Sequence, residues 1–231
     1  MQQIISQYIK FQQINSKFII KSDIFKKDDI RFIGGFDISC DLKNPDSACA
    51  FLSIFDLETK SIVHEEQHTS LIELPYVSGC LGLREVPHYL TLLDKIKGKP
   101  FYPNILMVDG FGILHQRQYG SASELGHISF IPSIGVGKTL LHIDGFKEKS
   151  VKKEFAKRCK NKGDYIPLVG DSGIVYGAAL KSSDNASNPL YVSIGHGISL
   201  ETSIEFVLTT SLYRIPEPIR NSDIKSKLAF K

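Results

Sequence analysis

The sequence predicts an α/β fold with a mixed central sheet, an antiparallel meander followed by parallel strands, flanked by helices. Two observations support this fold class. Three extended apolar segments come early in the chain and are separated only by short polar turns, as in consecutive antiparallel strands. After them, helical patterns alternate with short and almost wholly apolar runs, as in buried strands whose faces are covered by helices.

The first part of the chain supplies an N-terminal helix and the meander. Residues 1–21 mix apolar and polar positions at helical spacing, so we expect residues 1–29 to form a helical segment that covers the core. Strands are then expected at "RFIGGFDISC" (31–40), "SACAFLSIFDL" (47–57) and "SIVHEEQHTS" (61–70).

The middle of the chain alternates between helices and strands. A helix is predicted over 86–98, where leucine and isoleucine recur at helical spacing. Apolar runs at 103–112 and 131–138 predict buried strands. Between them, "SASELGHI" predicts a short helix, with Ser121 and Glu124 at the spacing of a capping box. Three further elements are expected, namely strands at 173–182 and 189–199 and a helix at 200–214.

Length and composition predict one globular domain that spans residues 1–231. Hydrophobic residues make up 42% and charged residues 23%, which is ordinary for a globular protein. No apolar run approaches the ~20 residues of a membrane-spanning helix, and we expect neither a signal peptide nor membrane association. The four cysteines lack CxxC spacing and suit a reducing compartment. We therefore expect an intracellular monomer, in the cytoplasm or nucleus, without an obligate protein partner.

The net charge of +3 is unevenly distributed. The segment "KEKSVKKEFAKRCKNK" (147–162) holds eight basic and two acidic residues. Such a run most often forms a solvated helix face, but a basic face can also hold a phosphate backbone. Lys152, Lys153 and Lys157 are the candidates for backbone binding.

Four acidic or imidazole side chains lie beside glycines or at the ends of apolar segments. They are Asp37, Glu85, Asp109 and His196. Each one alone is explained as a turn or capping residue. Together they suit a divalent metal, because aspartates at the ends of buried strands are poorly solvated unless a cation pairs with them. Hard oxygen ligands with one imidazole favour Mg²⁺ or Mn²⁺, and such a site can cleave a phosphodiester bond.

Two short motifs suggest other activities, but neither is complete. "IGVGKT" resembles a phosphate-binding loop, yet Pro132 stands where that loop needs its first glycine. "GDSG" (170–173) resembles the nucleophile segment of trypsin-like proteases, but nothing around His64 supports a catalytic triad. A nucleoside triphosphatase and a serine protease are therefore disfavoured.

The chain resembles the endonuclease V family from about residue 30 to 225. Six motifs carry the resemblance, in family order and with family-like spacing: "GGFDIS", "PYVSGCLGLRE", "LMVDGFGILHQRQYG", "IPSIGVGK", "YVSIGHGISLE" and "YRIPEPIRNSD". The elements "PYVSG", "REVP", "LVGDSG" and "PLYVS" look more like the eukaryotic branch than the bacterial one. The resemblance implies a ribonuclease H-like fold.

The resemblance also implies a metal centre. Asp37 and Asp109 would be the principal ligands of Mg²⁺, for which Mn²⁺ would substitute. Glu85 and His196 would complete the metal site or position water, and Lys138 would stand near the scissile phosphate.

A wedge and a base pocket are implied as well. Pro75, Tyr76, Val77 and Ser78 would form the wedge that fills the gap when a base is displaced from its stack. The displaced base would enter a pocket in which bare glycine backbone can approach a flat base edge closely. The matching pocket residues are Gly79, Leu81, Gly110, Gly112, His115, Gly120 and Leu141.

Several positions depart from the family's usual pattern. Phe111 replaces a polar residue, and Gly137 and Thr139 flank Lys138 where alanine and lysine are more usual. Ile194 and Gly197 flank His196 where proline or valine and a basic residue are more usual. The four positions expected at the metal site are present.

The implied activity is hydrolysis of the second phosphodiester bond on the 3′ side of inosine. The eukaryotic-like motifs favour single-stranded RNA, and deoxyinosine-containing DNA is a further expected substrate. Two alternatives remain: a ribonuclease H-like nuclease with another target, such as general RNA or junctions, and a non-catalytic nucleic-acid-binding module. The acids at 37, 85 and 109 argue against the second alternative, and the wedge and glycine pocket argue against the first.

Overall fold

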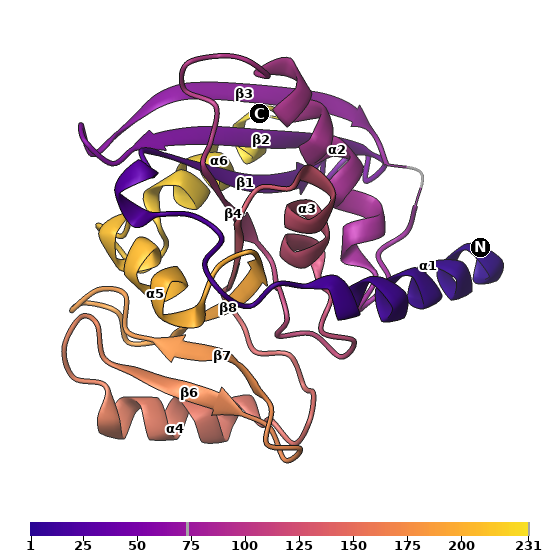
Figure 1. Ribbon diagram of the computed structural model, residues 1–231. Helices are drawn as coiled ribbons and strands as arrows, with labels where there is room; N and C mark the ends of the chain where they lie inside the picture. Colours follow the sequence, from indigo (N-terminus) through magenta and orange to yellow (C-terminus); the bar gives the residue numbers. More distant parts are fainter. Residues whose placement is uncertain (73, 231) are drawn as a thin grey trace.

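The computed structural model describes residues 1–72 and 74–230, and the described part of the chain is built on one sheet of eight strands (Figure 1). The strands are β1 (Phe32–Cys40), β2 (Ser47–Asp56), β3 (Ser61–Leu71), β4 (Ile105–Asp109), β5 (Ser133–Gly137), β6 (Tyr165–Val169), β7 (Val175–Leu180) and β8 (Leu190–His196). The helices are α1 (Gln2–Asn15), α2 (Leu81–Lys95), α3 (Ser121–Ser129), α4 (Glu148–Arg158), α5 (Leu200–Thr209) and α6 (Glu217–Leu228). Short 3₁₀ turns lie at Ser16–Phe18 and Lys27–Asp29.

The sheet is mixed, as the sequence predicts. Its strand order is β3-β2-β1-β4-β5-β8-β7-β6. The three central strands β1, β4 and β5 are parallel, and all the other pairings are antiparallel. The meander β1-β2-β3 forms one side of the sheet, and β8, β7 and β6 form the other. β8 therefore runs opposite to β5, a direction that an apolar run in the sequence does not reveal.

Helices cover both faces of the sheet. One core cluster joins Phe36, Leu52 and Leu106 of the sheet to α2 and α3. A second joins Ile33 and Ile105, whose side chains point to the other face, to α5 and α6. Neighbouring residues of one strand thus enter different cores, as the pleat requires. α4 packs on β6 and β7 around a third cluster, at the edge of the sheet far from β3 (Figure 1).

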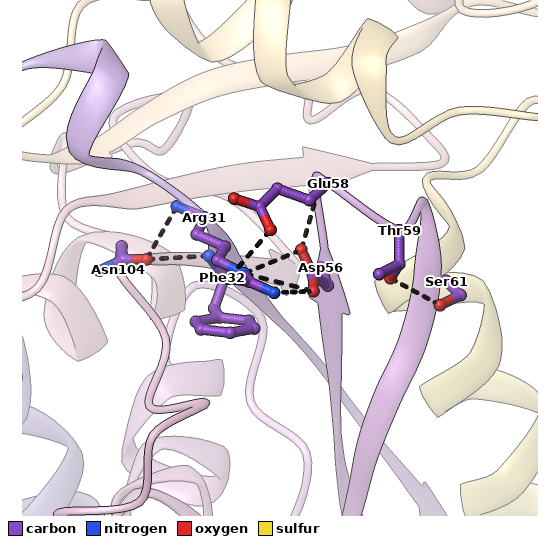
Figure 2. A network of polar contacts seen from close by, with 7 residues as sticks. All are labelled: Arg31, Phe32, Asp56, Glu58, Thr59, Ser61 and Asn104. Carbon is purple, nitrogen blue, oxygen red and sulfur yellow. Dashed lines mark hydrogen bonds and ion pairs between the residues drawn. The ribbon is translucent and has the colours of Figure 1, made fainter.

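A polar network fixes the start of β1 against its two neighbours (Figure 2). The side-chain oxygen of Asn104, just before β4, accepts hydrogen bonds from the backbone N–H groups of Arg31 and Phe32, at 3.0 and 2.8 Å. The Arg31 guanidinium lies 2.9 Å from the buried Asp56 at the end of β2 and also pairs with Glu58. These contacts hold the register that places Asp37 of β1 level with Asp109 at the end of β4.

Helix α6 approaches β1 very closely at Gly35. A Cβ on Gly35 would lie 2.2 Å from the backbone carbon of Pro218, so only glycine allows this packing. The Ser222 hydroxyl donates a 2.9 Å hydrogen bond to the Gly35 carbonyl and fixes the helix in register with the strand. The close contact brings the next turn of α6 over the carboxylate of β1.

Besides α1 and α5, which are shorter than expected and end at Asn15 and Thr209, the structure differs from the predicted elements in four places. β6 was not expected, and Pro167 lies within it; the strand tolerates proline because it pairs only with β7 at the sheet edge. α6 was not expected, because two of its four buried residues, Ser222 and Ser226, are serines rather than large apolar residues. α2 begins at Leu81, so that Pro87 lies inside the helix and not at its first turn.

The fourth difference is the expected capping box of α3, which was wrong. Gly120 is the N-cap residue, no side chain caps the helix, and Ser121 is its first residue. Glu124 is buried and accepts a hydrogen bond from the Tyr8 hydroxyl of α1, so its carboxylate is not available to the N-cap. Among the helices that the structure describes, none is long and apolar enough to cross a membrane.

Candidate active site

Three aspartates from three separate elements meet at one end of the parallel strands. Asp109 ends β4, and the parallel register that pairs Phe36 with Val108 places Asp37 of β1 at the same level. Asp223 reaches them from α6. One carboxylate oxygen from each residue lies within 4.8 Å of the others. Asp37 does not end its strand as expected, because β1 continues to Cys40.

The Asp37 carboxylate is the most buried of the three. Burial, and then the negative charge of Asp109, raises the pKa of Asp37 to about 7. The Ser226 hydroxyl donates a 2.8 Å hydrogen bond to Asp37 Oδ2 and opposes this rise. Two carboxylates this close repel one another unless a proton or a cation lies between them.

Lys138 supplies a positive charge at the cluster. Its Nζ lies 2.6 Å from Asp109 Oδ2 and 2.8 Å from Asp223 Oδ1. Burial favours the neutral amine, but the two carboxylates outweigh this effect and raise the pKa of Lys138. Lys227, one turn further along α6, binds the other oxygen of Asp223 at 2.8 Å. The site therefore combines several carboxylates with a cation directly after β5.

Glu85 of α2 lies near the three aspartates, on the other face of the sheet, but outside the group whose oxygens are within 4.8 Å of one another. It is buried, and among the described residues its Oε2 has no hydrogen-bond partner. Burial, followed by the charges of Asp37 and Asp109, raises its pKa well above the ordinary value. An unpartnered, buried carboxylate oxygen beside two aspartates is costly unless a cation completes the group. The donor set, oxygen atoms only, fits a hard divalent cation such as Mg²⁺ or Mn²⁺.

His196 does not join the carboxylates, which corrects its expected place in the metal site. Because β8 runs antiparallel to β5, His196 lies opposite Ser133 at the start of β5, whereas Asp109 is level with Val136 near its end. The His196 ring instead accepts a 3.4 Å hydrogen bond from the Ile20 N–H and packs against His127. It thereby ties the segment after α1 to the sheet.

A cavity of about 310 Å³ opens beside the carboxylates and shares Asp109 and Lys138 with them. Six of the seven expected pocket residues line it: Gly79, Leu81, Gly110, His115, Gly120 and Leu141. Gly112 does not line it; a Cβ there would lie 1.8 Å from the carbonyl oxygen of Ile194, so this glycine permits close packing behind the cavity. Of the expected wedge, Tyr76 and Ser78 reach the cavity wall.

The Gly79 carbonyl, at the base of the wedge, is held by three side chains. Gln12 of α1 donates to it at 3.2 Å, His115 lies at 3.1 Å, and Arg117 also donates to it. Gly79 has a φ of +76°, a conformation that other residues rarely adopt. Burial lowers the pKa of His115 to about 4, so the ring is neutral near pH 7. The base of the wedge is therefore rigidly placed, while Tyr76 itself is 69% exposed.

Comparison with known proteins decides which family this arrangement represents. The model of the family described as "Endonuclease V" matches residues 12–224. The chain belongs to the Endonuclease V family. It is 40% identical to human Endonuclease V over 197 residues, which are 84% of this chain and 70% of the human protein. For mouse Endonuclease V the identity is 41%, over 84% of this chain and 58% of the mouse protein.

Solved endonuclease V structures share the whole fold. The catalytic domain of human Endonuclease V superposes with a TM-score of 0.94 at 34% identity, covering 100% of both chains. A variant of the Ciona intestinalis enzyme, in complex with a 23mer DNA containing an inosine followed by a ribo-adenosine, superposes with a TM-score of 0.94 at 29% identity, covering 100% of this chain and 98% of that one. The ribonuclease H-like fold expected from the motifs is thus confirmed.

Two departures from the usual endonuclease V pattern prove to be linked. A Cβ on Gly137 would lie 2.3 Å from the Phe111 ring, so a larger residue at 137 would force the ring at 111 to move. Both residues line the cavity, beside Lys138. The ring gives the cavity an apolar wall at this point.

The basic segment is not part of this site. Lys152, Lys153 and Lys157 lie on α4, which packs on β6 at the edge of the sheet, and none of them lines the cavity. Lys152 also pairs with Glu148 of its own helix at 2.9 Å. These lysines can therefore contact a nucleic acid only if it is long enough to reach from the cavity to the β6 edge of the sheet.

Sequence reasoning missed Asp223, the third aspartate of the cluster. The residue ends the motif "YRIPEPIRNSD", which supported the family resemblance but received no role. Its only local signal is an acidic residue between two serines, Ser222 and Ser226, on a polar helix that packs against Gly35. That pattern indicates close helix packing and not a metal ligand, so the sequence could not have singled it out.

Proposed function

We propose that this endonuclease V chain is a metal-dependent nuclease that recognises hypoxanthine in a nucleic-acid strand and hydrolyses the second phosphodiester bond on its 3′ side. The observation that carries the proposal is the shared wall of the cavity and the carboxylate cluster. Asp109 and Lys138 belong to both, so a base in the cavity places its own backbone close to the carboxylates.

Asp37, Asp109 and Asp223 would hold the metal, with Glu85 beside them. When bound, Mg²⁺ or Mn²⁺ would orient water and stabilise the charge that develops on the leaving oxygen. Lys138 would release one of its carboxylates to the metal and turn its ammonium toward a phosphate oxygen. The unpaired oxygen of Glu85 would then gain a partner.

The cavity suits a single base. Its volume lies at the small end of the range of ligand pockets, about 300–1,000 Å³. Leu81 and Gly82 line it at the start of α2, where no side chain caps the helix. The first N–H groups of a helix lack partners within the helix, so they can donate to the keto oxygen of hypoxanthine. Adenine presents an amino group at that position and cannot accept.

Single-stranded RNA is the proposed preferred substrate, with deoxyinosine-containing DNA as a second one. The motifs shared with the eukaryotic branch support this preference. The Ciona intestinalis enzyme provides support for recognition in DNA, because it was solved with an inosine-containing DNA strand. Residues 75–78 would fill the space that the displaced base leaves in the stack.

A cleavage assay with four matched strands tests the proposal. The strands carry adenine or hypoxanthine at one position, as RNA and as DNA, and product ends are mapped with Mg²⁺ and with excess EDTA. We expect cleavage of both hypoxanthine strands, faster for RNA, only with metal and only at the second bond. Equal cleavage of the adenine strands would instead support a nuclease with another target.

A further inference from the structure

We propose that the Ser121 hydroxyl donates a hydrogen bond to a ring nitrogen, N3 or N7, of the purine that enters the cavity. This inference rests on the proposed function and assigns a specific contact within it. Ser121 is 3% exposed and lines the cavity at the first residue of α3. Among the described residues, its Oγ has no hydrogen-bond partner.

The other buried polar side chains of the cavity wall are already committed to protein partners. Gln12 donates to the carbonyls of Gly79 and Tyr119, and its oxygen accepts from Arg117 at 2.7 Å. His115 uses one ring nitrogen toward Gly79 and accepts from the Arg117 N–H with the other. Among the described residues that line the cavity, Ser121 is thus the buried polar side chain that still has unused hydrogen-bonding capacity.

The position of the hydroxyl explains why it remains open to a ligand. A Cβ on Gly110 would lie 2.5 Å from Ser121 Oγ, so the hydroxyl occupies the space beside a bare glycine next to Asp109. A side chain at 110 would displace it. A buried hydroxyl without a partner is unfavourable, and a ligand that accepts its proton removes this cost.

The positions of the acceptor atoms on a purine limit which of them Ser121 can contact. The keto oxygen of hypoxanthine is expected at the free N–H groups of Leu81 and Gly82, on the wall formed by α2. Ser121 belongs to a different element, as the first residue of α3. Purines carry two further acceptor nitrogens, N7 on the same edge as the keto oxygen and N3 on the opposite edge, and a rotatable serine hydroxyl can donate to either. Both nitrogens occur in adenine and hypoxanthine alike, so Ser121 would read the purine ring and not the lesion.

The same helix offers a matched control. Ser123 is 0% exposed and, like Ser121, its hydroxyl has no partner among the described residues, but it does not line the cavity. Ser121→Ala and Ser123→Ala therefore remove the same group from the same helix. Because neither hydroxyl has a protein partner, neither change should lower the melting temperature.

The test measures binding, in Ca²⁺, of strands that carry inosine, adenosine, 7-deazainosine, 3-deazainosine or an abasic site at one position. We expect Ser121→Ala to weaken binding to the inosine strand about 3- to 10-fold, the effect of one hydrogen bond. Ser123→Ala should leave it unchanged. Neither change should affect the abasic strand, and one deaza analogue should bind equally to wild type and Ser121→Ala.

Three results would overturn the inference. Unchanged inosine affinity in Ser121→Ala is one, and an equal loss on the abasic strand is another. The third is that both deaza analogues remain as sensitive to Ser121→Ala as inosine. Failure of the proposed function looks different, because wild type would then show no preference for inosine over adenosine. Loss of the Ser121 contact alone leaves that preference intact.

Discussion

Lys138 Nζ lies 2.6 Å from Asp109 Oδ2, so a lysine from the end of β5 neutralises the aspartate that ends β4. The same ammonium lies 2.8 Å from Asp223. The Lys138 ammonium thus links β4, β5 and α6 at the point where we propose that the metal binds. The lysine and a divalent cation would offer the same carboxylates a positive partner.

Lys138→Met should make the protein depend on metal for stability. Without metal, the variant leaves the carboxylates without the half-buried ammonium of Lys138 and should melt at a lower temperature than wild type. Mg²⁺ should raise its melting temperature more than that of wild type, because no lysine competes for the oxygens. Lys227→Met is the matched control, since Lys227 binds Asp223 from the exposed side. If Mg²⁺ raises the melting temperature equally in wild type, Lys138→Met and Lys227→Met, then Lys138 does not compete with the metal for the carboxylates.

Tyr76→Ala should weaken substrate binding without unfolding the protein. The side chain is 69% exposed, so its loss should change the melting temperature little, whereas truncating the fully buried Tyr119 should cost about 3–5 kcal/mol. Affinity for inosine-containing strands should fall by on the order of 1–3 kcal/mol, the value of one base stack. The loss should be greater for duplex than for single strands, because only a duplex must be unstacked. A large fall in melting temperature with unchanged affinity would show that residues 75–78 form a packed turn and not a wedge.

Neutralising Lys152, Lys153 and Lys157 tests whether α4 holds a long strand. If all three contact phosphates, the salt dependence of binding should flatten by roughly one unit of slope for each lost contact. The control neutralises Lys60, Lys97 and Lys99, which are exposed and lie outside α4. If the slope of binding against salt concentration is the same in the two triple variants, the three lysines do not contact phosphates and the segment is an ordinary solvated helix.

Glu124 should make the stability depend on pH. Burial raises the pKa of Glu124 from 4.5 to about 7 in the folded state. The folded protein therefore holds this proton more tightly than the unfolded chain, and its contribution is fully present below pH 4.5 and lost as the pH rises to about 7. The loss is on the order of 3 kcal/mol. Glu124→Gln should flatten the unfolding free energy across this range, while Glu201→Gln, at an exposed site, should not.

The fold was largely predictable because its signals are local. The meander follows from three apolar segments with short turns, and β4 and β5 follow from apolar runs. The edge strand β6 and helix α6 gave weak signals, because Pro167 interrupts the strand and two of the four buried residues of the helix are serines. Those elements owe their structure to partners distant in sequence.

The sequence could predict site residues only where they lie on strands whose direction in the sheet could be inferred. Asp109 ends a parallel strand, and the register of β1 places Asp37 beside it, as the expectation required. His196 lies away from the three aspartates because β8 runs antiparallel to β5 and places it opposite Ser133. Asp223 was missed because its position depends on the contact of α6 with Gly35, which no local pattern encodes.

The central claim is that Asp37, Asp109 and Asp223 form the metal centre. A Mn²⁺ titration followed by the paramagnetic resonance signal of the free ion tests it without substrate. The variants are Asp109→Asn, Asp223→Asn and His196→Gln, each first checked for a native circular dichroism spectrum. We predict that both aspartate variants bind Mn²⁺ at least ~10-fold more weakly than wild type and that His196→Gln binds it equally well. Unchanged affinity in the aspartate variants, or its loss in His196→Gln, would contradict the account.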